Sequence, residues 1–225
     1  MLGGHALNVA GLTNTGHVKV GAGSALTSMG PIESTGTLDN DGILLARATA
    51  ETRAAVMSRL EAQIVTARDG AEGRWTGKGI TSSAAAANPL TGLAAVPNDD
   101  RAGQPLITTN LGFVTPGIND LIVLHRYNGD ANLDGRINSD DYFRIDSGFL
   151  AQPQSPTYRD GDFNYDGKIN SDDYFLIDSA FLGQGAPLMG VAGSAALAAV
   201  AVPEPSSLLL GALMGGLLRR RRSRI

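Results

Sequence analysis

The spacing of apolar residues divides the chain into a β-prone first part and several helical segments. Residues 1–46 carry short apolar runs separated by Gly, Asn and Asp. Short runs with a turn signal about every eight to twelve positions predict strands in a sheet or in the rungs of a solenoid. We therefore expect a β-rich, solenoid-like N-terminal part. The alternative for these residues is a flexible segment rich in Gly, Ser and Thr.

A helical period replaces this pattern within residues 47–70. Val56, Leu60 and Ile64 fall on one helical face, and Thr49 is a suitable N-cap. An apolar stripe with this spacing usually belongs to a core. We therefore expect one amphipathic helix here that packs on the β layer.

Residues 71–126 are less regular. They contain Trp75, which lies close to glycines, and short β-prone pieces among Pro, Gly and Asn. A single Trp without neighbouring aromatic residues predicts a packing anchor rather than a carbohydrate-stacking face. We interpret the segment as irregular β structure or linker that ends in a predicted strand at 121–127.

The second half of the chain contains a tandem duplication. Residues 129–150 recur as residues 161–182, with 17 of 22 positions identical at an offset of 32. In each copy, side-chain oxygen donors stand at loop positions 1, 3, 5, 9 and 12, and a glycine stands at position 6. The donors of the first loop are Asp130, Asn132, Asp134, Asn138 and Asp141. The donors of the second loop are Asp162, Asn164, Asp166, Asn170 and Asp173.

This spacing predicts two Ca²⁺ sites, one in each loop. Ca²⁺ takes about six to eight oxygen ligands, so a chain that surrounds it presents donors at alternate positions and then turns sharply, which glycine permits. Arg136 and Lys168 occupy position 7, where the ligand is a backbone carbonyl and a basic side chain can point outward. Both loops end in Asp, whereas EF-hand loops end in Glu. The alternative is a solvated turn rich in Asp, Asn and Gly.

A short helix is predicted after each loop, with Ser139 and Ser171 as N-caps. Aromatic and aliphatic residues recur on one side of both helices, so the two helices can bury these sides against each other. No helix of similar quality is predicted before either loop. Residues 127–183 are therefore expected to form a small all-α module with two calcium loops.

Charge and composition narrow the classes of function. Residues 127–182 contain eleven Asp against four basic residues, a balance of −7, which argues against nucleic acid as a partner and favours a metal. The chain has no Cys and therefore no disulfide or thiolate metal site. Its three His are isolated, and no GxSxG or HExxH motif occurs. We identify no catalytic residue and expect a protein that is not an enzyme.

The end of the chain has a different composition again. Residues 184–202 are an Ala- and Gly-rich linker, and residues 203–225 join Pro203-Glu204-Pro205 to an apolar run and an Arg cluster. As a helix the apolar run would measure about 20 Å, against about 30 Å for the hydrocarbon core of a bilayer. We expect a short transmembrane-type helix, with the Arg cluster on the cytoplasmic side.

Residues 127–183 resemble a type I dockerin, because two Asp-terminated loops stand about 32 residues apart and one short helix follows each. The resemblance implies one Ca²⁺ per loop and two antiparallel helices that bind a cohesin. Calcium binding carries over residue by residue. Cohesin binding does not, because Asp146 and Asp178 stand where the family has basic residues. The residues at loop positions 10 and 11, which also face the cohesin in that family, are Ser139, Asp140, Ser171 and Asp172.

Three further segments resemble parts of bacterial surface proteins. Residues 1–46 resemble the terminal rungs of autotransporter-associated β-repeats, and the stretch around Trp75 resembles one that precedes paired calcium loops in exported planctomycete-type proteins. Residues 203–225 resemble a PEP-CTERM sorting signal, which directs an exported protein of Gram-negative bacteria to a membrane-bound processing enzyme. An ordinary membrane anchor is the alternative for this tail.

The N-terminus has neither the basic nor the apolar region of a signal peptide. Because sorting signals of this kind accompany exported proteins, we expect either the C-terminal piece of a longer protein or a misassigned start.

These features support an exported, non-enzymatic protein of a Gram-negative cell envelope or extracellular surface, transiently anchored by its C-terminal helix. Its role would be structural or adhesive, with polysaccharide as a further partner. The alternative is a carbohydrate-active enzyme fragment or a scaffold-docking subunit with a cohesin-like partner. An intracellular calcium sensor is disfavoured, because loops without entering helices have little to open.

Overall fold

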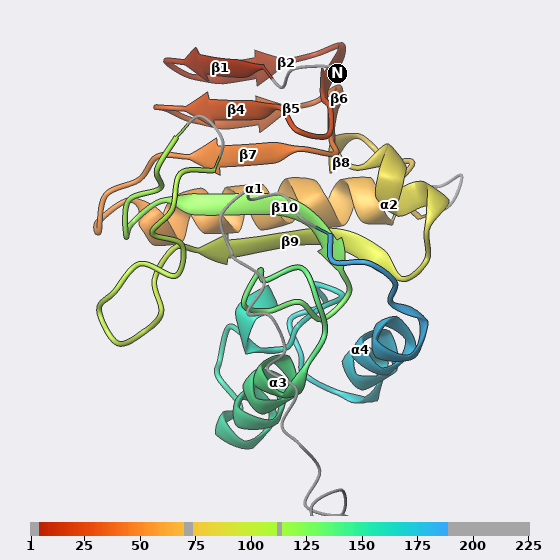
Figure 1. Ribbon diagram of the computed structural model, residues 1–225. Helices are drawn as coiled ribbons and strands as arrows, with labels where there is room; N and C mark the ends of the chain where they lie inside the picture. Colours follow the sequence, from red (N-terminus) through yellow and green to blue (C-terminus); the bar gives the residue numbers. More distant parts are fainter. Residues whose placement is uncertain (1–4, 70–73, 112–113, 189–225) are drawn as a thin grey trace, which may run out of the picture. The chain divides into compact units, whose positions relative to one another are not determined.

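The computed structural model describes residues 5–69, 74–111 and 114–188, and all of them belong to one compact unit of the chain. Figure 1 shows the elements in chain order. The predicted tail helix in residues 203–225 and the linker residues 189–202 lie outside the described residues. Within the described residues, no helix is long and apolar enough to cross a membrane.

Seven short strands occupy residues 6–46, and each of the first four pairs in parallel with the third strand after it (Figure 1). Leu12 lies opposite Ile32, and His17 lies opposite Thr37, so both pairs are 20 positions apart. Turns at Gly, Asn and Asp separate the strands, as the sequence pattern predicts. The strands are β1 (Ala6–Val9), β2 (Leu12–Asn14), β3 (His17–Val20), β4 (Ala25–Ser28), β5 (Ile32–Ser34), β6 (Thr37–Asn40) and β7 (Ile43–Ala46).

The predicted solenoid-like fold class is wrong, because this stack does not close into a solenoid. After β7 the sheet continues with two longer strands, β10 (Leu121–Tyr127) and β9 (Thr91–Pro97), in the order β1-β4-β7-β10-β9. β10 pairs antiparallel with both β7 and β9. The antiparallel pairing ends the parallel stack, and both added strands are almost fully buried. The result is a mixed α/β protein.

Helix α1 covers one face of this sheet. It packs on β9 of this sheet and on β8 (Gly79–Thr81), which belongs to the separate three-stranded sheet β3-β6-β8. Leu60 and Ile64 of the predicted stripe are buried, while Val56 is only partly buried. Its N-cap is Thr52 and not Thr49, the predicted cap. The described residues contain four α-helices and one 3₁₀ helix. They are α1 (Arg53–Arg68), α2 (Ser83–Ala87), α3 (Ser139–Ala151), η1 (Tyr158–Asp160) and α4 (Ser171–Gly183).

Alternate residues of the central strands enter two different apolar clusters. Leu44 and Val123 belong to the cluster beneath α1, which also contains the buried Trp75, so this Trp anchors the core. Leu45 and Leu124, one position later in each strand, belong to the other cluster. The sheet is therefore covered on both faces, which the alternation within β7 and β10 makes possible.

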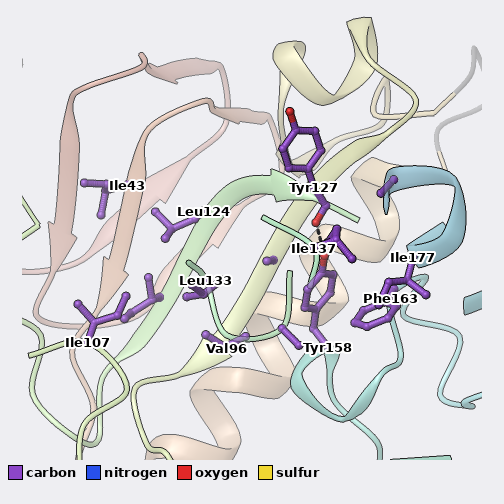
Figure 2. Packing of buried hydrophobic residues seen from close by; sticks show 14 of the residues in the cluster. Ile43, Val96, Ile107, Leu124, Tyr127, Leu133, Ile137, Tyr158, Phe163 and Ile177 are labelled. Atoms are coloured by element: carbon purple, nitrogen blue, oxygen red, sulfur yellow. Dashed lines mark hydrogen bonds between the residues drawn. The ribbon is translucent and has the colours of Figure 1, made fainter. Parts of the chain in front are cut away.

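The second cluster joins the sheet to the duplicated loops (Figure 2). Val96 and Leu124 of the sheet share it with Ile137, Phe163 and Ile177 of the repeats. The hydroxyl of Tyr165, a residue of the second loop, donates to the Leu93 carbonyl at 2.8 Å and accepts the Ala95 N–H at 2.9 Å. The calcium-loop region is thus not the separate all-α module that the sequence predicts, because strands β9 and β10 supply part of its core.

Candidate metal centre

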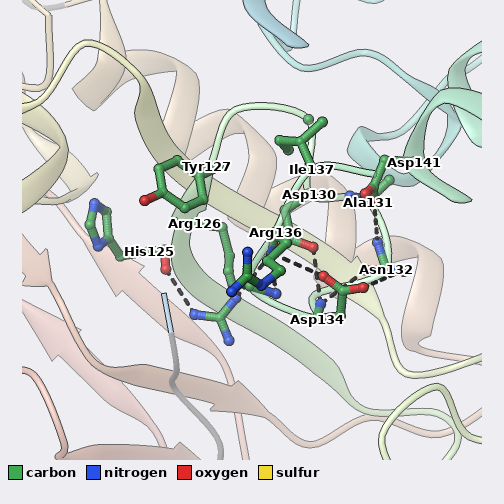
Figure 3. A network of polar contacts seen from close by, with 12 residues as sticks. His125, Arg126, Tyr127, Asp130, Ala131, Asn132, Asp134, Arg136, Ile137 and Asp141 are labelled. Atoms are coloured by element: carbon green, nitrogen blue, oxygen red, sulfur yellow. Dashed lines mark hydrogen bonds and ion pairs between the residues drawn. The ribbon is translucent and has the colours of Figure 1, made fainter. Parts of the chain in front are cut away.

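The first loop is folded around its first and last carboxylates (Figure 3). Asp130 and Asp141 are fully buried. The Oδ1 atom of Asp130 accepts the Asp134 N–H at 3.0 Å, and its Oδ2 atom accepts the Gly135 N–H at 2.9 Å. The Asp141 carboxylate accepts the N–H groups of Ala131 and Asn138. These bonds draw the loop into a ring, and Gly135 makes the turn with a φ of +90°.

The second loop repeats this arrangement. Asp162 accepts the N–H groups of Asp166 at 3.0 Å and Gly167 at 2.9 Å, and Gly167 has a φ of +81°. Asp173 accepts the N–H groups of Phe163 and Asn170. Because the two loops share their bonding pattern as well as their sequence, any chemistry of the first loop is available to the second.

The two Asn side chains among the candidate ligands of the first loop both bond to the carboxylate of Asp134. Asp134 Oδ2 accepts hydrogen bonds from the side-chain amides of Asn132 at 3.1 Å and Asn138 at 2.9 Å. In the second loop, Asn164 donates to Asp166 in the same way at 3.3 Å. The side chains of Arg136 and Lys168 are exposed, as expected for position 7. The structure thus gathers the predicted donors within each loop, and their role as ligands remains a prediction.

The N-caps of the two exit helices differ from the prediction by one residue. Asn138 caps α3 and Asn170 caps α4, and each side-chain oxygen accepts the N–H two residues later at 2.8 Å. Ser139 and Ser171 are the first helical residues. The Asn side chain is the N-cap rather than the Ser side chain because it belongs to the closed loop and is already directed at the helix N-terminus. The helices are therefore positioned by the same side chains that line the loops.

Burial raises the pKa of the closing carboxyl groups. It raises the pKa of Asp130 to about 8, of Asp141 to about 7 and of Asp162 to about 6, and it also raises the pKa of Asp173. Neighbouring carboxylates of the same loop add to the effect in all four cases. A hard divalent cation bound among these carboxylates would favour their charged form and offset their mutual repulsion.

Carboxylates alone do not form this site. Within the described ranges, no three His, Cys, Asp or Glu side chains come together as a metal cluster. A cation in these loops would depend on the Asn side chains and the position-7 carbonyls as well. Such a mixed set of carboxylate, amide and carbonyl oxygens fits Ca²⁺.

The two loops differ in the charges beside them, which the sequence pattern did not reveal. Arg126 of β10 is 3% exposed, and its Nε lies 3.3 Å from Oδ2 of Asp130. The equivalent residue of the second repeat is the neutral Tyr158, whose hydroxyl donates to the Tyr127 carbonyl. Near the second loop lies Glu61 of α1, whose pKa is raised to about 7 by burial and by Asp162 and Asp160. Extending the repeat upstream to residue 126 would have revealed the first difference.

Residues after α4 close onto the first loop. The side-chain amide of Gln184 donates to the Ile137 carbonyl and accepts the Ile137 N–H, both at 2.9 Å. The Leu188 N–H donates to the Gly135 carbonyl at 3.0 Å. The Tyr127 hydroxyl accepts the N–H of Gly185 at 2.9 Å. We call residues 184–188 the clasp.

The exit helices expose three equivalent apolar pairs. Their side chains are 45–84% exposed, although each helix also buries an Ile in the core. The Tyr142 hydroxyl donates to Asp178 and the Tyr174 hydroxyl donates to Asp146, both at 2.6 Å, so these carboxylates tie the two helices together. The exposed pairs are Phe143 and Phe175, Phe149 and Phe181, and Leu150 and Leu182.

The fold and the loops define a mixed α/β protein that carries a paired calcium-loop module. Residues 128–182 match the family model of the dockerin type I domain. Dockerin type I domains bind calcium and cohesin partners. The match covers less than half of the chain. No curated protein and no solved structure matches the chain.

Proposed function

We propose that this chain is a calcium-dependent docking subunit that binds one Ca²⁺ in each of its two loops and presents helices α3 and α4 to a cohesin-like partner. The observation that supports it best is the repeated ring of Asp and Asn side chains around two buried carboxylates. Asp130, Asn132, Asp134, Asn138 and Asp141, with the Arg136 carbonyl, would hold the first ion. Asp162, Asn164, Asp166, Asn170 and Asp173, with the Lys168 carbonyl, would hold the second ion.

The exposed apolar residues on α3 and α4 support the docking part. Large apolar side chains that are exposed together on one surface often mark an interaction site. Phe143, Leu150 and their equivalents are such residues. Calcium would act on this surface indirectly, because the loop residues Asn138 and Asn170 cap the helices that carry it.

For the whole protein we propose an exported, non-enzymatic surface role. This part rests on the sequence of the tail, where Pro203-Glu204-Pro205, an apolar run and an Arg cluster follow each other. Outside the cell, calcium is abundant enough to fill sites of modest affinity. The docking module would then fold and act where it meets its partner.

A calcium titration followed by ¹H–¹⁵N NMR tests the calcium part. The N–H groups of Gly135 and Gly167 each donate to the first carboxylate of their own loop, so each signal reports one site. We expect both signals to shift and saturate with Ca²⁺. Asp134→Ala should abolish only the Gly135 response, and Asp166→Ala only the Gly167 response. Two glycine signals that ignore millimolar Ca²⁺ would refute the proposal.

Capture on immobilised cohesin domains tests the docking part. Binding should require Ca²⁺ and should weaken when Leu150 and Leu182 are both replaced by Glu, because a charge would then enter the apolar surface. Lys168→Arg, which copies the residue of the first loop, is the matched control and should bind normally. Calcium binding without capture by any cohesin of a broad panel would leave the metal site intact and would refute the docking role.

A further inference from the structure

Two arginines beside α3 and η1 have a buried Nε without a hydrogen-bond partner, and neither forms an ion pair with another described residue. Arg159, in η1, is 3% exposed, and its Nε has no hydrogen-bond partner among the described residues. Arg144, in α3, also has a buried Nε without a partner in this part of the chain. Neither guanidinium takes part in any of the ion pairs between described residues. A buried guanidinium N–H without an acceptor is unfavourable, so an acceptor from outside the described residues would stabilise this arrangement.

Nearby carboxylates do not supply that counter-charge, because each has other partners. Asp160 pairs with Arg101 and accepts two hydrogen bonds from Thr157. Asp99 pairs with Arg53 at 2.8 Å, and Asp100 accepts the N–H groups of its own loop. Burial, Arg144 and Arg101 lower the pKa of Arg159 to about 10, although Asp99 and Asp100 act in the opposite direction. The positive charges at this place therefore outnumber the carboxylates that are free to meet them.

All three arginines line one pocket. It has a volume of about 290 Å³ and lies between α3, η1 and the loop around residues 100–101. Asp100 and Asp160 also line it, so its three arginines face two carboxylates. Phe143 and Pro153 form an apolar part of its wall. The space exceeds that of a single small ion, so the pocket can hold an anionic group together with the carrier to which it is attached.

The internal repeat shows that this pocket belongs to one copy alone. Arg144 is replaced by Leu176 at the equivalent position of α4, and Arg159 corresponds to Tyr127 of β10. Position 144 is one of only five differences between the two 22-residue copies. Calcium binding does not explain this difference, because neither arginine stands at a loop position.

We propose that Arg144, Arg159 and Arg101 form a binding site for an oxyanion group, such as a carboxylate or a sulfate, borne on a carrier that lies against Phe143 and Pro153. Guanidinium groups bind carboxylate, sulfate and phosphate through paired N–H donors. The site is separate from the calcium loops, and it shares Phe143 with the apolar surface that we propose for cohesin binding. A free acidic sugar and an acidic group of a polymer share this chemistry.

The test uses the calcium-loaded full chain and follows the side-chain Nε–Hε signals of arginine by ¹H–¹⁵N NMR. The probes are sulfate, acetate and glucuronate, each at constant ionic strength, with glucose as the uncharged counterpart of glucuronate. Phosphate is avoided because it precipitates calcium. We expect saturable shifts of the Arg144 and Arg159 signals with at least one anion. Tighter binding of glucuronate than acetate would identify a ring-borne carboxylate, and sulfate binding alone would identify a sulfated group.

Arg144→Leu copies the residue of the second repeat and should weaken the response of Arg159 at least about tenfold. Arg59→Leu, the same substitution at an exposed arginine of α1, is the matched control and should leave the response unchanged. Arg144→Gln serves in the same way if Arg144→Leu is poorly folded, as judged by the Gly135 and Gly167 signals. The proposal is overturned if no anion gives a saturable shift, or if Arg144→Leu and Arg59→Leu both respond like the wild type.

Discussion

Charged residues beside the two calcium loops distinguish them. Arg126 pairs with Oδ2 of Asp130, which also accepts the Gly135 N–H. The other oxygen, Oδ1, accepts the Asp134 N–H and has a second lone pair for a cation. A positive charge in this position weakens the attraction of the loop for a second cation. The second loop has the neutral Tyr158 in its place and Glu61 nearby. The second loop should therefore fill at lower calcium concentrations.

Replacing Arg126 should strengthen calcium binding in the first loop. We expect Arg126→Met to lower the calcium concentration at the midpoint of the Gly135 shift roughly tenfold or more, because the repulsion between Arg126 and the bound cation is removed. Arg126→Lys keeps the charge and should keep the midpoint. The Gly167 signal of the same samples is the internal reference. An unchanged Gly135 midpoint in Arg126→Met would contradict the electrostatic explanation.

Helix α3 approaches its neighbour more closely than α4 does. Gly148 faces the backbone of η1, where an added Cβ would lie 1.9 Å from the Asp160 carbonyl oxygen. The equivalent residue of α4 is Ala180, which is fully buried without such a conflict. The near-identical helices thus need different residues at the same position, because the segments that precede their loops differ.

Gly148→Ala should therefore destabilise the protein. The helix propensity of Ala would favour the variant by about 1 kcal/mol, but the clash with rigid backbone should outweigh this and give a net loss of about 1–3 kcal/mol. Chemical denaturation followed by circular dichroism measures the change. Ser147→Ala, at the exposed neighbouring position, should stay within about 0.5 kcal/mol of the wild type. A Gly148→Ala protein as stable as the wild type would show that η1 can move away.

The five-stranded sheet of the described residues has a different apolar cluster on each face. Trp75 is the only Trp of the chain and lies in the cluster beneath α1, whereas the calcium loops contribute to the other cluster. Residues of β7, β9 and β10 alternate between the clusters, so disruption of one face removes the support of the other. The loops and the sheet are therefore expected to unfold together.

Chelation of calcium should lower the stability of the sheet as well as that of the loops. We expect excess EDTA to lower the melting temperature reported by Trp75 fluorescence, and re-added Ca²⁺ to restore it, because a ligand that binds only the folded state stabilises the whole cooperative unit. Far-ultraviolet circular dichroism should give the same midpoint. Two separate transitions, with the Trp75 midpoint indifferent to EDTA, would contradict this coupling.

Local patterns could be predicted from the sequence, and contacts between distant residues could not. The candidate ligands of each loop stand within twelve positions, and the hydrogen bonds that gather them are local. Their spacing in the sequence was therefore enough to predict that they come together, whereas their role as ligands remains a prediction. The buried stripe of α1 was equally readable at Leu60 and Ile64. The antiparallel pairing of β10 with β7 joins residues more than 70 positions apart, and its apolar run did not reveal its partner. Arg126 was missed because its effect depends on this placement.

The clasp ties the first calcium loop to residues outside the matched repeat. Gln184 and Leu188 bond to the first loop from beyond the end of the family match, and Arg126 and Tyr127 reach it from before its start. A fragment cut at 128 and 182 would lose all of these contacts and would strip the apolar core from β9 and β10. The duplicated loops are therefore not structurally independent, and moving them to another protein would require their flanking residues and the supporting sheet to move with them.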